Sequence, residues 1–337
     1  MPTVMLTTRC PNSCEWCFAR AKMGEYRARG IEEMSWEDFL AVVSYYEQAG
    51  LNHMILLGGE PTLHTRFEDI LVFLESRNFS SLVVTNGICD KELVDALAQK
   101  KIPRTSFSVN TTAYFRYPAE TRERVDYFLR SINHPVMLAY TLTAKDVEGK
   151  SIHPLLDRIG MIMKFGLVRH IQFQIAVPGQ QNSSFVPFGD CGNAIRLLDS
   201  WFKILRKNGI SAALDCQCIP KCLIKDIGEI GFEVRSQCSG FMIDIGPALE
   251  VWPCFPLSGQ SLPLKRFRNF DEIKTFFSKI NAQDNLYYDE SCSECSERAR
   301  GACDAGCRGF QILRKRDQYS NTSFLHQPAV ACNIFSC

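Results

Sequence analysis

From Cys10 to Cys17 the chain reads CPNSCEWC, which places three cysteines in the spacing C-x3-C-x2-C. The stretch follows an apolar run at Thr3–Leu6 that predicts a β-strand. A [4Fe–4S] cluster normally takes four thiolates, so three thiols on one loop leave one iron without a protein ligand. Zinc sites more often use pairs of cysteines about two to four residues apart, completed by a second pair. The stretch therefore favours an iron–sulfur cluster with one iron open for chemistry.

Length and composition narrow the class of protein. The 337 residues suffice for one large domain and a smaller one. A formal net charge of +1 gives no reason to expect nucleic acid or an anionic membrane as partner. No apolar run approaches the roughly 18 residues that cross a bilayer, and the first residues lack the features of a signal peptide. We therefore expect a cytoplasmic protein, and among its 16 cysteines we expect metal binding rather than disulfides; Cys89 and Cys191 are expected to be ordinary buried thiols.

Short apolar runs alternate with longer amphipathic ones as far as about residue 208, and this alternation predicts strands and helices in turn. The predicted strands are Thr3–Leu6, His53–Leu57, Leu82–Thr85, Thr105–Val109, Val136–Leu142 and His170–Val177. The predicted helices are Trp36–Ala49 with Ser35 as N-cap, then Phe67–Arg77, Lys91–Gln99, Thr121–Ile132, Pro154–Phe165 and Ala194–Lys207. The pattern indicates an α/β fold with a parallel sheet and right-handed crossovers. Six such units make a partial (β/α)6 TIM-type barrel.

A second motif, Gly58-Gly59-Glu60, follows the second predicted strand. In TIM-type barrels the reactive groups lie on loops at the C-terminal ends of the strands. We therefore expect this motif and the cysteine motif on the same face of the sheet. Glycine has no side chain in the way, so Gly58 and Gly59 offer backbone that a ligand can approach closely.

Together the two motifs resemble those of the radical S-adenosylmethionine (SAM) superfamily, and the resemblance spans residues 1–208. In that family an aromatic residue precedes the last cysteine, as Trp16 does here, and strand two ends in GGE. The resemblance implies that Cys10, Cys14 and Cys17 hold a [4Fe–4S] cluster. The amino and carboxylate groups of SAM would chelate its free iron, and the backbone around Gly58–Glu60 would bond the methionine amino group. Trp16 would lie near the adenine.

Further contacts to SAM are expected inside the barrel. On the fourth predicted strand Ser106, Ser108 and Asn110 share one face by period-two alternation. The resemblance implies that Ser108 and Asn110 face the cofactor, and the alternative is a polar barrel lining without a SAM contact. Thr143 and Asn86 are further candidates, although Asn86 with the glycine after it also suits a tight turn.

After about residue 209 the predicted elements become short, and a second cysteine series begins. Its members are Cys238, Cys254, Cys292, Cys295, Cys303, Cys307 and Cys332, with Gly246 between the first two. The series resembles the SPASM extension of radical SAM enzymes, a seven-cysteine domain that holds two auxiliary [4Fe–4S] clusters. We therefore expect a small, irregular, cysteine-rich SPASM domain over residues 209–337. A zinc ribbon built from Cys292, Cys295, Cys303 and Cys307 is the structural alternative.

The resemblance also implies how these cysteines pair. Cys292, Cys295, Cys303 and Cys332 would hold the distal cluster, and Cys238, Cys254 and Cys307 the proximal one, nearer the barrel. The fourth proximal ligand would come from upstream, where Cys216, Cys218 and Cys222 are available and Cys222 is favoured. If none of them reaches the cluster, its open iron could bind substrate.

SPASM enzymes mostly modify ribosomally made peptides or proteins, so the resemblance implies an oxidative maturase. It would form a thioether or C–C crosslink or oxidise a side chain, with a 5′-deoxyadenosyl radical removing the hydrogen. Auxiliary clusters could carry away the remaining electron, and a flavodoxin- or ferredoxin-type donor would supply the first one. The first strand begins almost at Met1, so we expect leader-peptide recognition from a separate protein or another surface.

Two other functions are weighed against this one. The first is a dehydrogenase or epimerase that acts on a small-molecule natural-product intermediate, and the second is an electron carrier, which needs no GGE motif. The sulfatase-maturing branch has an acid after the second SPASM cysteine, whereas Cys254 precedes Phe255; this disfavours formylglycine formation. Asp244, Glu250 and Tyr140 are candidate general bases, each with a plain packing role as the alternative.

Overall fold

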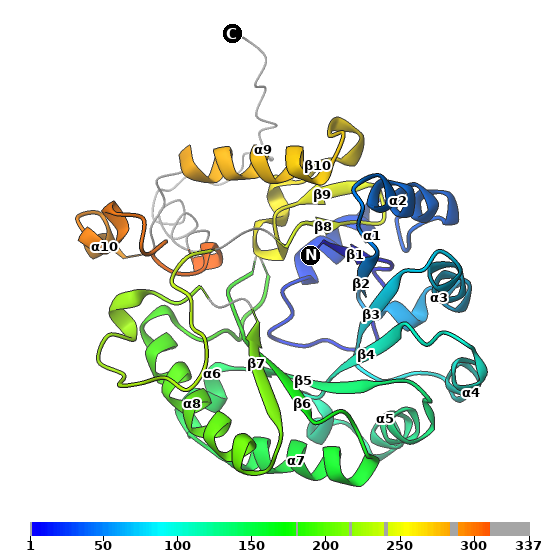
Figure 1. Ribbon diagram of the computed structural model, residues 1–337, viewed down its shortest axis with the longest axis horizontal. Coiled ribbons are helices and arrows are strands. Elements are labelled where there is room, and N and C mark those ends of the chain that lie inside the picture. Colours follow the sequence, from blue (N-terminus) through cyan, green and yellow to red (C-terminus); the bar gives the residue numbers. More distant parts are fainter. Residues whose placement is uncertain (1, 180, 216–217, 239–241, 284–288, 311–337) are drawn as a thin grey trace.

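The strands of the described residues form one twisted, mostly parallel sheet that curves into an incomplete barrel (Figure 1). The computed structural model describes residues 2–179, 181–215, 218–238, 242–283 and 289–310. The strand order is β10-β9-β8-β1-β2-β3-β4-β5-β6-β7. Strands β1 to β7 and β8 pair in parallel, whereas the β8–β9 and β9–β10 pairs are antiparallel. The predicted partial barrel of α/β class is confirmed.

The bounds of the elements follow the predicted alternation closely. The strands are β1 Thr3–Met5, β2 His53–Leu57, β3 Ser80–Thr85, β4 Thr105–Asn110, β5 Val136–Leu142, β6 His170–Ile175, β7 Ser211–Asp215, β8 Asp244–Ile245, β9 Glu250–Trp252 and β10 Leu262–Pro263. The helices are α1 Arg20–Ala28, α2 Trp36–Gln48, α3 Phe67–Ser76, α4 Lys91–Gln99, α5 Ala119–Ser131, α6 Ala144–Gly149, α7 His153–Phe165, α8 Cys191–Lys207, α9 Phe270–Gln283 and α10 Ser296–Ala299. Short 3-10 turns are η1 Pro61–Leu63, η2 Tyr114–Arg116, η3 Phe188–Asp190, η4 Lys221–Leu223, η5 Phe255–Gln260, η6 Leu264–Arg266 and η7 Glu290–Cys292.

Helix α2 begins at Trp36, directly after Ser35, which the sequence predicted as its N-cap. The Ser35 hydroxyl accepts a hydrogen bond from the Asp38 backbone N–H at 3.0 Å, which satisfies one of the free donors of the first turn. Gly50 lies just beyond the helix end with φ +66°, a left-handed conformation that glycine adopts without strain. Both ends of this helix are therefore set by local sequence.

Four strands extend the sheet past the six that the sequence predicted, β7 at one end and β8, β9 and β10 at the other. Strand β7 pairs in parallel with β6, although its sequence, SAALD, carries little β-propensity. Strand β8 returns to the opposite side and pairs in parallel with β1. The sheet thus runs across residue 208, and the domain boundary expected there stays a prediction.

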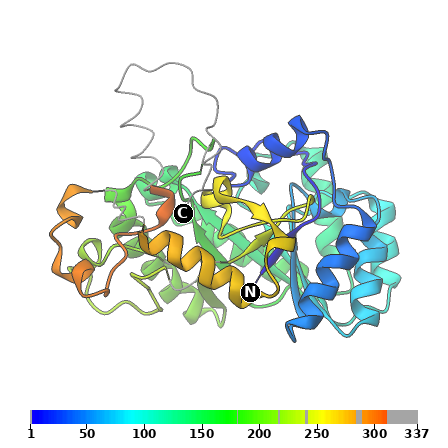
Figure 2. The ribbon, with the colours of Figure 1, turned by 90° about the horizontal axis from the view of Figure 1, so that it is seen from above.

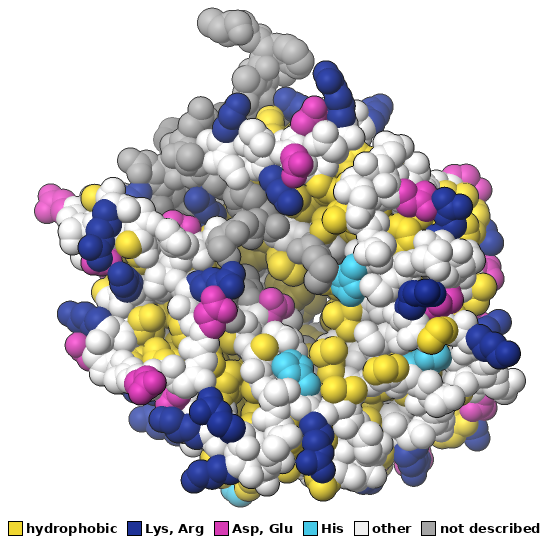
Figure 3. Space-filling model, in the orientation of Figure 1, with side chains coloured by type: hydrophobic (Ala, Val, Ile, Leu, Met, Phe, Trp, Pro, Cys, Tyr) yellow, Lys and Arg dark blue, Asp and Glu magenta, His cyan; other side chains and the backbone are white. Residues whose placement is uncertain are grey.

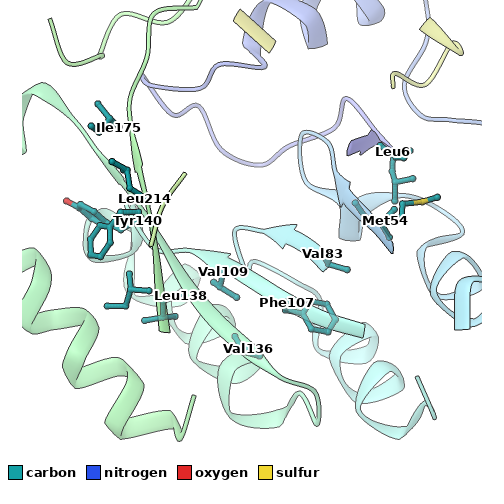
Figure 4. Close-up of a cluster of buried hydrophobic side chains, with 14 of the residues drawn as sticks. Leu6, Met54, Val83, Phe107, Val109, Val136, Leu138, Tyr140, Ile175 and Leu214 are labelled. Carbon is teal, nitrogen blue, oxygen red and sulfur yellow. The ribbon is translucent and has the colours of Figure 1, made fainter. Parts of the chain in front are cut away.

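The main core lies between the outer face of the sheet and the surrounding helices. Figure 4 shows part of this cluster, and the labelled side chains come from successive strands of the sheet and from Leu6, directly after β1. Phe107 on β4 is fully buried and meets Phe128 of α5 edge-on, with ring centroids 5.3 Å apart. Removing such a side chain would cost about 3–5 kcal/mol. Because the odd positions of β4 face this core, its even positions face the barrel interior.

The two ends of the barrel differ. Figure 2 shows α1 on the side toward which the parallel strands run, with the N-terminus on the other side. On the face shown in Figure 3, basic and acidic side chains are interspersed around the rim. No helix in the described part of the chain combines the length and apolar character needed to cross a membrane.

Candidate functional site

The loops after β1 and β2 are fastened to each other at the C-terminal edge of the sheet. The Gly59 N–H donates to the Thr7 carbonyl at 2.7 Å, and the Glu60 N–H donates to the Arg9 carbonyl at 2.7 Å. These bonds continue the pairing of the two strands beyond their ends. The cysteine motif and the GGE motif therefore share one face of the sheet, as predicted.

The two glycines of the second motif are required by this close approach. A Cβ on Gly58 would lie 2.7 Å from the Thr7 carbonyl oxygen, and one on Gly59 would lie 2.9 Å from the Cβ of Cys10. Real Cβ atoms essentially never come so close to other heavy atoms. The backbone of the cysteine loop thus occupies the space that the missing side chains leave, which brings bare backbone beside Cys10.

The third residue of the motif, Glu60, is fully buried and its carboxylate is already occupied. It accepts hydrogen bonds from the Thr62 N–H and hydroxyl at 3.2 and 2.8 Å, from the Thr85 hydroxyl at 2.7 Å and from the Asn86 N–H at 2.7 Å. Burial raises the pKa of Glu60, while these hydrogen bonds oppose the shift. Glu60 therefore ties the end of β2 to the end of β3.

Asn86 uses its side chain to make the turn after β3. Its amide oxygen accepts a hydrogen bond from the Ile88 N–H at 2.8 Å, and Gly87 has φ +76°. This is the local arrangement that stabilises an Asx turn. The geometry therefore supports a tight turn at Asn86 and Gly87.

The three cysteines of the first motif are partly buried, and the Cys17 N–H donates to the Cys14 carbonyl at 3.1 Å. Burial raises the pKa of Cys10 to about 12 and that of Cys14 to about 11, and it also raises the pKa of Cys17. Without a cation these thiols stay protonated, whereas a bound metal favours the thiolates. A hollow of about 330 Å³ opens beside Cys10, next to Arg27. Three soft sulfur donors beside bare glycine backbone fit the iron–sulfur cluster that the resemblance implies.

Trp16 is held by residues that the sequence did not single out. Its side chain is 9% exposed, and the Arg116 guanidinium lies 4.7 Å from its ring centroid. Nearby, the Asn12 amide donates to the Tyr117 hydroxyl at 2.7 Å. Arg116 and Tyr117 belong to η2 and its end, after β4, where no motif marks them. The cysteine loop is therefore braced from across the barrel as well as from β2.

The candidate SAM contacts on β4 and β5 line the barrel interior. Asn110 donates to the Thr141 hydroxyl at 3.1 Å, and Ser108 shares its face of the sheet. The lining continues on β6 and β7, where Gln174 donates to the Asp215 carboxylate at 3.4 Å. The sequence analysis did not single out either residue: Gln174 lies on the predicted strand β6 but belongs to no motif, and Asp215 lies on β7, which was not predicted.

Thr143 has a local role at the start of α6. Its hydroxyl donates to Asp146 at 2.8 Å, and its N–H bonds the same carboxylate at 2.7 Å as part of a capping box. Such a cap stabilises the helix by about 1 kcal/mol. The expected SAM contacts of Trp16, Gly58–Glu60, Ser108, Asn110 and Thr143 remain predictions.

The later cysteines separate into two neighbourhoods. A hydrogen bond with Cys238 makes the largest contribution to raising the pKa of Cys218. Burial makes the next largest, and the Cys307 thiol adds a smaller one. Burial raises the pKa of Cys222, and the nearby Cys303 and Cys295 thiols add to it.

The expected pairing of these cysteines, with Cys222 as the favoured fourth proximal ligand, remains a prediction. Cys254 directly precedes η5. Cys216 and Cys332 lie outside the described residues. Among the described residues, no group of three or more His, Cys, Asp or Glu side chains is arranged to hold a metal ion.

Helix α1, which follows the cysteine loop, is joined to β9 by buried charges. Glu250 of β9 accepts a hydrogen bond from the Tyr26 hydroxyl at 2.9 Å and pairs with Arg29 at 2.8 Å. The ammonium of Lys22, 1% exposed, lies 3.4 Å from the same carboxylate. A Cβ on Gly246 would collide with the Tyr26 hydroxyl, so this glycine makes room for the contact. We call these residues the α1–β9 latch.

The three candidate general bases all have partners in the fold. Glu250 belongs to the α1–β9 latch, and Tyr140 donates to Asp146 at 2.7 Å. Asp244 is fully buried and accepts a hydrogen bond from Thr3. These contacts agree with the packing role that the sequence analysis named as the alternative for each residue.

Comparison with known proteins agrees with this geometry. Residues 4–134 match the family model described as the radical SAM superfamily. A probable GTP 3′,8-cyclase of Pyrococcus horikoshii is 26% identical over 207 residues, which cover 60% of this chain and 64% of that protein. The tungsten-containing aldehyde ferredoxin oxidoreductase cofactor-modifying protein of Pyrococcus furiosus is 31% identical over 108 residues, 31% of this chain and 29% of its own. The chain spans less than two thirds of the length of these relatives.

Solved structures share the fold at low identity. Streptococcus suis SuiB bound to S-adenosylmethionine superposes with a TM-score of 0.64 at 14% identity, over 93% of this chain and 73% of its own. The protein anSMEcpe with bound AdoMet gives a TM-score of 0.56 at 15% identity, over 95% of this chain and 92% of its own. With the family match and the two motifs joined at one edge of the sheet, the chain contains a domain of the radical SAM superfamily.

Proposed function

We propose that this protein is a radical SAM enzyme that oxidatively modifies a ribosomally made peptide or protein. The observation that carries the proposal is the contact between the loops after β1 and β2. It brings the start of the cysteine loop, at Arg9 and Cys10, against the bare backbone of Gly58 and Gly59 at the C-terminal edge of the sheet. Cys10, Cys14 and Cys17 would hold a [4Fe–4S] cluster there. When bound, cluster and SAM supply a 5′-deoxyadenosyl radical after one-electron reduction.

The residues of the chain orient the reactants and exclude water. The backbone around Glu60 would bind the methionine amino group, since the Glu60 side chain itself is occupied. Trp16, covered by Arg116, closes one side of the site. Ser108 and Asn110 present hydroxyl and amide groups from the barrel wall, and such fixed polar groups set the orientation of a bound molecule.

Two observations support a peptide substrate and a net oxidation. SuiB, which has the same fold, has been solved with a precursor peptide, SuiA. The spacing of the cysteines after residue 217 resembles that of a SPASM domain, in which such cysteines would hold two auxiliary [4Fe–4S] clusters. A substrate that loses one hydrogen atom and one proton must pass a further electron to an acceptor, and these cysteines could hold one. A flavodoxin- or ferredoxin-type protein in the cytoplasm would supply the initiating electron.

A small-molecule enzyme is the second candidate. It is favoured by the names of two relatives, a GTP 3′,8-cyclase and a cofactor-modifying protein, neither of which is named for a peptide substrate. The polar lining of β4 to β7 would suit a polar natural-product intermediate as well as a peptide backbone. A dehydrogenase or an epimerase would use the same edge of the sheet.

The experiment that tests the proposal begins with anaerobic reconstitution. The protein should bind about twelve irons per chain and release 5′-deoxyadenosine with dithionite and SAM. Co-expression with a short peptide encoded beside it should give a peptide that has lost two hydrogens, as measured by mass spectrometry. Release of 5′-deoxyadenosine with an unmodified peptide would favour the small-molecule enzyme, and no release would refute both.

A further inference from the structure

The middle of the cysteine loop has no helix or strand to order it. Residues 8–19 form neither element. Within them, residues 11–13 separate the first two cysteines and residues 15–16 the last two; we call these the two intercysteine segments. Because ordering an irregular segment costs conformational entropy, contacts from other parts of the fold must offset that cost.

The turn after β4 contacts each intercysteine segment once. In the first segment, the Asn12 side-chain amide donates to the Tyr117 hydroxyl at 2.7 Å. In the second segment, the ring centroid of Trp16 lies 4.7 Å from the Arg116 guanidinium, a distance at which a cation is attracted to an aromatic face. Two adjacent residues of one turn therefore hold the side chains of both segments.

Other contacts reach the backbone of the same segments. Arg20, the first residue of α1, donates to the Ser13 and Cys14 carbonyls at 2.9 and 2.5 Å. The Ser183 N–H donates to the Glu15 carbonyl at 3.0 Å. These bonds fix carbonyl groups, whereas the contacts with the turn after β4 fix the two side chains named above.

The turn after β4 is itself anchored, in part by a buried arginine. Arg158 of α7 is 4% exposed, and its guanidinium donates to the Thr111 carbonyl and hydroxyl at 2.5 and 3.2 Å. The same guanidinium lies 5.2 Å from the ring centroid of Phe115, and the Tyr114 hydroxyl donates to Asp126 of α5. Because a buried charge is stable only with such partners, the turn is fixed against α7 as well as α5.

We propose that Arg116 and Tyr117 are positioning residues, which hold the cysteine loop in its folded shape with or without a bound metal. Tyr117 orders the first intercysteine segment and Arg116 the second. One consequence rests on the proposed function: a loop that is already ordered loses less entropy when it binds a cluster, so it should retain the cluster longer.

The test measures amide hydrogen exchange in the full-length, iron-free protein, by mass spectrometry of peptides that cover residues 11–17. Tyr117→Phe and Arg116→Gln should each raise the exchange rate of these peptides about fivefold to tenfold, because the loop opens more often. Arg116→Lys keeps a cation beside the Trp16 ring and should give a smaller increase than Arg116→Gln. Wild-type exchange in both Tyr117→Phe and Arg116→Gln would overturn the inference.

Two matched control variants lie on α5. Tyr127→Phe removes a hydroxyl that donates to Asp95, and Arg130→Gln breaks an exposed ion pair with Glu123. Neither residue contacts the cysteine loop through a bond described here, so both controls should leave the exchange of residues 11–17 unchanged. An increase as large in the controls as in the test variants would also overturn the inference.

A double variant shows whether the Asn12–Tyr117 bond itself carries the effect. Asn12→Ala removes this bond from the side of the loop, so the combination with Tyr117→Phe should exchange no faster than either single variant. Additive increases would contradict the role given to Tyr117. Should Tyr117→Phe not fold, Asn12→Ala alone must raise the exchange, and wild-type exchange in it would refute that role.

Iron binding separates this inference from the proposed function. After anaerobic reconstitution, Tyr117→Phe and Arg116→Gln should lose iron to a chelator about fivefold faster than the wild type. A wild type that binds no iron refutes the proposed function, while the exchange rates of the iron-free protein still decide whether the turn orders the loop. A wild type that binds iron, with unaltered exchange in both variants, refutes only the positioning role.

Discussion

Residues 6–17 leave the sheet at the end of β1 and are held by backbone bonds to the neighbouring strand end, whereas residues 218–310 carry their cysteines on short turns and loops. In the first region the barrel exists without the cysteines, and Gly58, Gly59 and Glu60 fix the loop. In the second region few regular elements surround the thiols, so bound clusters would supply much of the cohesion. We infer that the sheet fixes the loop of the first site, whereas bound clusters would hold the loops of the second site in place.

The largest effect is expected from removing a cysteine of the first region. Cys14→Ala should reduce the release of 5′-deoxyadenosine by at least about a thousandfold, because a cluster ligand is lost without disturbing the barrel. Product is measured by chromatography with mass detection after dithionite and SAM are added. Cys191→Ala is the control, and a Cys14→Ala protein as active as this control would refute the site.

Next in size is the response of the two regions to the loss of iron. In iron-free protein the amide hydrogens of residues 218–238 and 289–310 should exchange at least about tenfold faster than after reconstitution. Those of β2 to β5 should exchange alike in both states, because the sheet holds them. Hydrogen exchange read by mass spectrometry checks this, and equal protection of both regions in both states would remove the contrast.

Gly59→Ala tests whether close approach fixes the first region. The new Cβ would collide with the Arg9 carbonyl and the Cβ of Cys10, and overpacking of this kind costs about 1–3 kcal/mol. We expect that loss of unfolding free energy together with weaker SAM binding, measured by denaturation and calorimetry. Gly160→Ala of α7 is the control, since its Cβ meets nothing within 4 Å; equal behaviour of the two variants would be evidence against the close approach.

The α1–β9 latch joins the two regions, and Glu250→Gln should weaken it. Burial raises the pKa of Glu250, but hydrogen bonds from Arg29 and Tyr26 and the charge of Lys22 outweigh it and lower the pKa overall. In the variant the buried ammonium of Lys22 keeps only one ion-pair partner, the partly exposed carboxylate of Glu25. We expect this loss to cost about 2 kcal/mol of unfolding free energy. Glu233→Gln breaks an exposed pair with Arg235 and should change stability little. An equal loss of unfolding free energy in both variants would show that the α1–β9 latch stabilises the fold no more than an exposed ion pair does.

The smallest effect concerns Asp244 on β8, where the later chain rejoins β1. Burial raises the pKa of Asp244 to about 7, although the Thr3 hydrogen bond opposes the shift, and Tyr46 is a further titratable group that interacts with it. The folded protein then holds a proton that the unfolded chain releases, so stability should fall as pH rises from about 4 to 7. In Asp244→Asn the decrease in unfolding free energy over this pH range should be smaller by about 1–2 kcal/mol. Denaturation at pH 5 and pH 8 measures it, and identical slopes for both proteins would count against the shift.

The sequence by itself determined the strands β1 to β6, most of the helices between them, though not α1 or α6, and the meeting of two motifs at one edge. Hydrophobic period, the Ser35 cap and the glycine after α2 act between residues close in the chain, so they can be read locally. The rule that parallel strands end at one edge then brings Cys10 and Gly59 together without further information.

Only the tertiary structure decided which distant residues share a space. Strand β7 exists because β6 offers it a partner, and Gly246 is small because Tyr26 needs its room. The placement of residues 218–222 depends on the Lys221–Glu297 pair and on the close approach of Pro220 to Gly306. Such contacts join segments far apart in the chain, and cysteine spacing alone carries no information about them.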